Sequence, residues 1–150
     1  MEYEPTLSSA LNFSKLNRLE EWLHLFLCKE GNNKAFSEGL KLEPRRYYAP
    51  KLFELSKFTR CCGPEKNMKY QVDNENFIKR VNKITDKFSK GDWDMPPLII
   101  NRNGKSYELN DGNHRYEALK KLELRNIGLL YGKQSTTITN PTAIFHSPSR

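Results

Sequence analysis

The stretch PLIINRNGKSYELNDGNHRYEAL, residues 97–119, decides the fold, because it carries a strand, a tight turn, a second strand and a helix start in succession. The run from 98 to 100 is short, apolar and β-branched, as buried strands are. Asn103-Gly104 favours a type I′ hairpin turn, and the alternating residues after it predict the returning strand. Apolar residues with helical spacing then predict a helix over 114–122.

Upstream of this stretch, the clearest helix is predicted over residues 74–90. Apolar side chains recur from Phe77 to Phe88 with the spacing of a single helical stripe. Asp73 is suited to cap the N-terminus of this helix, and Gly91 is suited to end it.

Three further elements are predicted with weaker patterns. Residues 16–29 have the periodicity of an amphipathic helix, and residues 46–55 favour an edge strand in which Pro50 fits only at the edge or at a bulge. Residues 127–131 favour a final strand. The connector over 31–44 is rich in Gly and Asn, and its pattern indicates no particular structure.

These elements predict an α+β fold, with α/β-like order, in which helices pack on a small mixed sheet. At 150 residues one domain is expected. We expect residues 1–43 to add a helical layer to that domain and residues 44–132 to form its core. Residues 133–150 are rich in Ser, Thr and Pro and are expected to form a flexible tail outside the core.

Charge and composition narrow the class of protein. The formal net charge is +7, but the excess is spread along the chain and no segment forms a basic arm. No apolar run reaches the roughly 18 residues that a membrane span needs, and the N-terminus lacks a secretory layout. Three cysteines, with Cys61 and Cys62 adjacent, indicate reduced thiols. We therefore expect a cytoplasmic protein without a membrane partner.

The chemistry is expected where the second strand turns into the helix, at residues 109–119. Backbone N–H groups at a helix start have no partner within the helix, so such a turn attracts anions. Gly112 allows close backbone approach, His114 and Arg115 add donors, and Asp111 is suited to hold Mg²⁺ or to accept a proton. The alternative is ordinary capping chemistry at a solvated helix end.

The order of these elements resembles the ParB/sulfiredoxin superfamily over residues 44–132. The resemblance rests on the helix ending in Gly91, the Pro97-to-Ile100 strand, the Gly-Asn-His-Arg turn over 112–115 and the apolar segment NIGLLY. It implies that Gly112, Asn113, His114 and Arg115 bind the phosphates of an ATP, ADP or CTP-type nucleotide, with Mg²⁺.

Departures from the family's patterns separate its branches. Sulfiredoxins have a catalytic Cys where Asn113 stands, so their repair chemistry lacks its nucleophile here. Partition proteins have Arg-Arg where His114-Arg115 stands, and a helix-turn-helix domain follows, for which the 18 residues after 132 leave no room. The DGxHR form is closer to free serine kinases and to ParB-like nuclease domain proteins.

Other polar residues are weaker candidates. Arg60 and Glu65 lie before the main helix and could face the same nucleotide; the alternative is a plain connecting turn. Glu30 could supply a carboxylate from outside the core motif; the alternative is a helix C-terminus and loop. His24 and Cys28 share a helix face at i,i+4 spacing, but buried packing explains them better than metal binding.

The sequence therefore predicts a nucleotide-binding enzyme that performs Mg²⁺-dependent phosphoryl transfer to a small-molecule acceptor, or nucleotide hydrolysis. In this hypothesis Asp111 holds the metal, His114 and Arg115 hold phosphates, and Glu30 or Glu65 activates the acceptor. The alternative is a nucleic-acid-binding or nuclease module without a helix-turn-helix reader. A third interpretation is a nucleotide-dependent regulatory switch.

Overall fold

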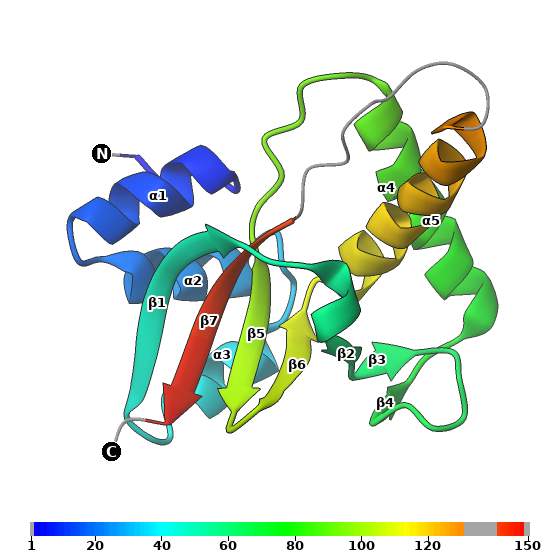
Figure 1. Cartoon of the computed structure of the whole chain (residues 1–150). Helices are drawn as coiled ribbons and strands as arrows, with labels where there is room; N and C mark the ends of the chain where they lie inside the picture. Colours follow the sequence, from blue (N-terminus) through cyan, green and yellow to red (C-terminus); the bar gives the residue numbers. More distant parts are fainter. Residues whose placement is uncertain (1, 131–140, 149–150) are drawn as a thin grey trace.

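The computed structural model describes residues 2–130 and 141–148, and it has an α+β architecture around a five-stranded mixed sheet (Figure 1). The strand order is β1-β7-β5-β6-β2. The strands are β1 (Arg45–Leu52), β7 (Thr142–Pro148), β5 (Leu98–Asn103), β6 (Ser106–Asp111) and β2 (Thr59–Arg60). β5 runs parallel to β7 and antiparallel to β6. The predicted fold class is therefore confirmed.

Helices cover both faces of this sheet. The remaining elements are α1 (Leu7–Lys15), α2 (Leu19–Cys28), α3 (Lys34–Leu40), the short 3-10 helix η1 (Leu55–Lys57), α4 (Asn74–Ser89), α5 (Asn113–Leu130) and a small sheet of β3 (Cys62–Gly63) and β4 (Tyr70–Gln71). Helices α1 to α3 form the expected N-terminal layer, and α4 packs along α5 (Figure 1).

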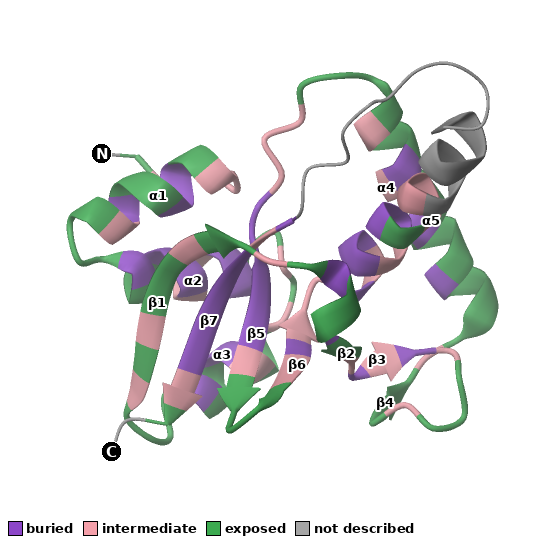
Figure 2. Ribbon diagram, viewed as in Figure 1, coloured by how far each residue is buried: buried purple, intermediate pink, exposed green. Residues whose placement is uncertain are grey.

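Alternation along the central strands places two of the three core clusters on opposite faces of the sheet, and the third lies between α4 and α5. Ile99 of β5 and Ile144 of β7 pack against α1 to α3, whereas their neighbours Leu98, Ile100 and Phe145 pack with Tyr116 and Leu119 of α5. Because successive side chains of a strand point to opposite faces, the central strands β5 and β7 are buried on both sides (Figure 2).

The largest correction to the sequence analysis concerns the C-terminal segment. Residues 142–148 were expected in a tail outside the core, but they form β7, between β1 and β5 in the centre of the sheet. Ala143, Ile144 and Phe145 are almost completely buried. A short apolar run was present there, and the surrounding Ser, Thr and Pro residues obscured it. Residues 133–140, also assigned to the tail, lie outside the described residues.

Two helix predictions are also corrected. A strand was predicted over residues 127–131, but residues 127–130 belong to α5, which continues to Leu130. Residue 131 lies outside the described residues. The helix predicted over 16–29 begins only at Leu19, after a turn in which Asn17 has a φ of 55°. α1 and α3 were not predicted.

Several local predictions are confirmed. The side chain of Asp73 caps α4 by accepting a hydrogen bond from the N–H of Asn76, 3.0 Å away. β1 is an edge strand, and its register shifts around Pro50.

The β5–β6 hairpin is also present, but its two turn residues are Gly104 and Lys105 rather than the predicted Asn103-Gly104, because Asn103 pairs with Ser106. Gly104 has a positive φ of +62° and Lys105 does not, which fits type II′ rather than the predicted type I′.

Truncating Ile144 to alanine tests the position of β7. Removing a fully buried side chain between two layers should lower the free energy of unfolding by about 2–5 kcal/mol. Leu52→Ala is the control, since Leu52 is 66% exposed on the edge strand and its truncation should cost less than about 0.5 kcal/mol. Urea denaturation measures both, and equal effects would contradict a central β7.

Candidate functional site

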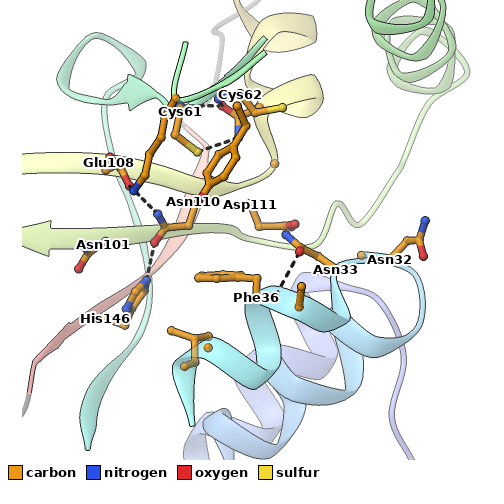
Figure 3. A pocket seen from close by; sticks show the side chains of 18 of the residues that line it. Asn32, Asn33, Phe36, Cys61, Cys62, Asn101, Glu108, Asn110, Asp111 and His146 are labelled. Atoms are coloured by element: carbon orange, nitrogen blue, oxygen red, sulfur yellow. Dashed lines mark hydrogen bonds and ion pairs between the residues drawn. The ribbon is translucent and has the colours of Figure 1, made fainter. Parts of the chain in front are cut away.

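The candidate site is a cleft of about 640 Å³ at the N-terminus of α5 (Figure 3). One wall comes from α3 and the loop before it, the floor from β5, β6 and β7, and the opposite wall from the β3–β4 region and α4. The lining combines polar and apolar surface and is rich in side-chain amides; it includes Asn32, Asn33, Phe36, Asn101, Asn110 and His146. We call it the first cleft.

A second cleft of about 340 Å³ lies beside the same turn, and it is lined partly by Phe26, Ile84 and Trp93. The residues that line both clefts are Gly31, Arg80, Asp111, Gly112 and His114. The start of α5 therefore lies where the two clefts meet.

The turn itself has the predicted form of a strand that runs into a helix start. Gly112 has a φ of +102°, and a Cβ there would stand 2.5 Å from Leu98 Cδ2, so glycine is required. The first hydrogen bond of the helix runs from the N–H of Tyr116 to the carbonyl of Gly112, at 2.8 Å. The N–H groups of residues 113 to 115 consequently have no acceptor within the helix, and they carry its positive dipole end.

Arg115 was expected to bind phosphate, but its guanidinium is buried and forms hydrogen bonds within the protein. Its Nη1 donates to the carbonyls of Pro96 and Pro97, and its Nη2 donates to Asp111 Oδ2, 2.9 Å away. The residue is only 7% exposed. The guanidinium therefore fastens the turn to the segment before β5.

Asp111, the predicted metal ligand, is the counter-charge of Arg115. Burial raises the pKa of Asp111, and the Arg115 guanidinium acts against that rise. Because the charge of Asp111 is already neutralised within the protein, little of it is available to a cation.

Asn113 also has a structural role. Its Oδ1 accepts the N–H groups of Cys61 (3.2 Å) and Cys62 (3.3 Å), and its Nδ2 donates to the carbonyl of Leu109, 3.3 Å away. The side chain of Asn113 thus ties the segment after β2 to the start of α5. Because the side chain of Asn113 is used within the protein, only its backbone N–H is available to a ligand.

His114 lies at the junction of the clefts and packs against Phe77, with the ring centroids 4.8 Å apart. Burial, reinforced by the charges of Arg80, Arg115 and Arg60, lowers the pKa of His114 to about 4. At neutral pH the ring is therefore uncharged, and it can act as a hydrogen-bonding group but not as a cation.

Arg60 lies near the turn, where its charge acts on His114, but neither Arg60 nor Glu65 faces the candidate site. They pair with each other, Arg60 also lies 3.6 Å from Glu117, and neither residue lines either cleft. Glu30 does line the second cleft, where its carboxylate accepts a hydrogen bond from the Tyr3 hydroxyl at 2.5 Å.

His24 and Cys28 were expected to be buried, but Cys28 is exposed and His24 is only half-buried. His24 and Cys28 both contact the hydroxyl of Ser37, at 2.7 and 3.6 Å. All three cysteines are free, and the described part of the chain contains no group of three or more metal-ligating side chains.

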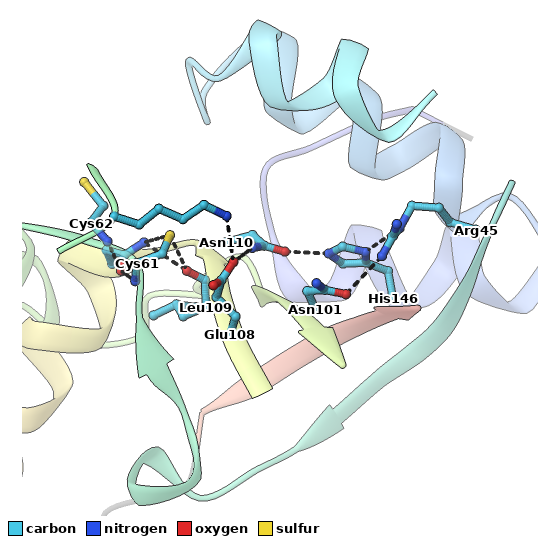
Figure 4. A network of polar contacts seen from close by, with 10 residues as sticks. Arg45, Cys61, Cys62, Asn101, Glu108, Leu109, Asn110 and His146 are labelled. Carbon is cyan, nitrogen blue, oxygen red and sulfur yellow. Dashed lines mark hydrogen bonds and ion pairs between the residues drawn. The ribbon is translucent and has the colours of Figure 1, made fainter. Parts of the chain in front are cut away.

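Among the residues of the first cleft that were not predicted from the sequence are two arginines and a histidine. Arg80 of α4 lies at the junction of both clefts, and among the described residues no carboxylate lies within 4 Å of it. Its position three residues after Phe77, beside the stripe that faces α5, was the available signal. Arg45 and His146 meet across β1 and β7 (Figure 4). No local pattern could pair them, because they are 101 residues apart in sequence.

Comparisons with known proteins identified no relative of this chain. No protein-family model, curated protein or solved structure matches this chain. Within residues 2–130 and 141–148, no helix is long and apolar enough to cross a membrane. What the protein binds is therefore inferred from the geometry of its two clefts.

Replacing Asp111 by asparagine tests whether this carboxylate is a structural partner. Loss of its charge leaves the buried guanidinium of Arg115 unpaired, which should lower the free energy of unfolding by about 3–5 kcal/mol. The control is Glu21→Gln, in an exposed pair with Arg18, and it should leave stability nearly unchanged. Urea denaturation decides; a stable Asp111→Asn protein would show that the pair is dispensable.

Proposed function

We propose that this protein binds the phosphate groups of an ATP, ADP or CTP-type nucleotide at the N-terminus of α5, with Arg80 as the side-chain cation. The observation that carries the proposal is the coincidence of three features at the junction of the clefts. These are the free N–H groups of residues 113 to 115, a guanidinium without a carboxylate partner in the described structure, and the neutral donor His114.

The first cleft suits the rest of a nucleotide. Its volume of about 640 Å³ lies within the usual range for small-molecule and cofactor sites. Phe36 and Tyr70 supply aromatic surface for a base, and the surrounding asparagine side chains supply both donors and acceptors for its edge. The resemblance to the ParB/sulfiredoxin superfamily supports the same choice of ligand, with Arg80 in the role that Arg115 was expected to have.

The residues of the turn do not fit a resident Mg²⁺ site. Asp111 is held by Arg115, and the described residues contain no cluster of three ligating side chains. Mg²⁺ often binds through substrate phosphates with only one or two protein carboxylates, so in this proposal it enters with the nucleotide.

A phosphoryl transfer would use both clefts. The terminal phosphate would lie at the junction, and a hydroxyl-bearing small molecule would occupy the second cleft. In this proposal Glu30, which lines the second cleft, would take the proton of that hydroxyl, and Glu65, which lines neither cleft, would not. Catalysis would come mainly from positioning and from the positive charge around the transferred group.

Arg80→Ala should weaken nucleotide binding by about 1.5–3 kcal/mol, roughly 10- to 150-fold, since it removes a charge-assisted contact. Lys79→Ala is the matched control, because it removes the same charge from the neighbouring position of α4 outside both clefts. Isothermal titration of ATP, ADP and CTP with and without Mg²⁺ measures the difference. Equal losses in the two variants, or no binding by the wild type, would refute the proposal.

A nucleic-acid interface is the second candidate, and one observation favours it. Arg80, Lys83 and Lys87 follow one another at helical spacing along the second cleft, and Trp93 lies beside Lys87. A row of cations next to an aromatic side chain is typical of surfaces that bind single strands.

Salt dependence separates the two candidates. If the row binds a single strand, the logarithm of affinity for labelled oligo(dT) should fall with the logarithm of salt concentration, with a slope of about −0.7 per contacted phosphate. Lys83→Ala/Lys87→Ala should then make that slope shallower by about 1.4. Fluorescence anisotropy measures it, and an unchanged slope in the double variant would rule out this surface.

A further inference from the structure

Arg45 differs from the other hydrogen-bonded arginines of the described structure in the groups that accept its hydrogen bonds. Other arginines with side-chain hydrogen bonds are paired with carboxylates: Arg18 with Glu21, Arg60 with Glu65, and Arg115 with Asp111. Arg45 instead donates from Nε to His146 Nδ1, 2.8 Å away, and from Nη2 to Asn101 Oδ1, 3.0 Å away. Both acceptors are neutral groups, so the guanidinium is fixed in place while its charge stays uncompensated.

The direction of the hydrogen bonds fixes the protonation of His146. Since Nδ1 accepts from Arg45, the proton of the neutral ring is on Nε2, which donates to Asn110 Oδ1 at 2.7 Å. Asn110 in turn donates to Glu108, 3.0 Å away (Figure 4). Burial and the nearby Arg45 lower the pKa of His146 to about 3, so this arrangement persists at neutral pH.

The charges that line the first cleft do not balance within the described structure. Glu108 is paired with Lys69, 3.8 Å away, and Asp111 is paired with Arg115. The two lining cations that remain without a carboxylate are Arg80 beside the α5 turn and Arg45 on β1. The cleft thus has two separate centres of positive charge, on different elements of the fold.

We propose that Arg45 is a second anion-binding position of the first cleft, which takes an oxyanion, either a carboxylate or a phosphate group, of the bound ligands. A guanidinium has five N–H donors, and two of those of Arg45 are used within the protein, so three remain. That is enough for a two-pronged bond to an oxyanion. His146 is a positioning residue that presents this group.

This proposal deepens the proposed function, and it rests on the first cleft being the ligand site. It defines the chemistry of what fills the cleft: one anionic group at the start of α5 and another at Arg45. Either a single molecule has an anionic group at each end, or a second, anionic ligand lies beside the nucleotide.

The test uses the full chain labelled with ¹⁵N, titrated separately with acetate and with inorganic phosphate while the Arg45 Nε–H resonance is followed. We expect a saturable shift with at least one of the two anions, and the anion that binds identifies the group as a carboxylate or a phosphate. A shift that grows linearly without saturation would overturn the proposal, because it would indicate only a solvated surface charge.

Matched variants locate the binding group. Arg45→Gln should abolish the response of the Asn101 side-chain amide, whereas Arg46→Gln, an exposed neighbour outside the cleft, should leave it unchanged. His146→Phe should weaken binding at least tenfold, and His146→Asn, which retains an acceptor oxygen, should restore it to within about threefold. The wild-type titration decides even if a His146 variant fails to fold.

The outcomes distinguish this proposal from the proposed function. If only Arg80 and residues 113 to 115 respond to phosphate, the Arg45 position is refuted and nucleotide binding at the turn survives. If Arg45 responds saturably but nucleotides do not bind in an Arg80-dependent manner, the second position stands and the proposed function falls.

Discussion

The architecture of the site depends on one buried guanidinium. Arg115 reaches from the first turn of α5 to the carbonyls of Pro96 and Pro97 and to Asp111, and so it joins the helix, the end of β6 and the entry to β5. A charge buried this deeply is tolerated only when it is paired and hydrogen-bonded. The position of the α5 N-terminus, and with it the junction of the two clefts, follows from this set of contacts.

The same logic distinguishes two kinds of arginine in this fold. Where a guanidinium meets a carboxylate, as Arg60 meets Glu65, the pair neutralises itself and holds backbone segments together. Where it meets neutral acceptors or none, as with Arg45 and Arg80, the positive field is directed into the first cleft. Residue type alone therefore does not show which arginine charges are compensated within the fold; the partner of each guanidinium does.

Local features of the fold were predictable from sequence because they depend on neighbouring residues. The Asp73 cap and the β5–β6 hairpin are of this kind, and so is the Gly112 turn. The site was harder, because sequence places His114 and Arg115 at a helix start but does not say which of them faces inward. Strand β7 was missed for another reason. A strand of seven residues has little local periodicity, and the polar residues before and after it hide its short apolar run.

The central place of β7 has a consequence for how the chain is made. β1 and β7 are paired across about a hundred residues, so the sheet closes only after residues 142–148 have left the ribosome. Until then Ile99 and Leu98 of β5 lack the strand that shields one of their edges, and the apolar faces of α2 and η1 are incompletely covered. Nascent chains that do not yet include residues 142–148 therefore expose an unpaired strand edge, which favours aggregation.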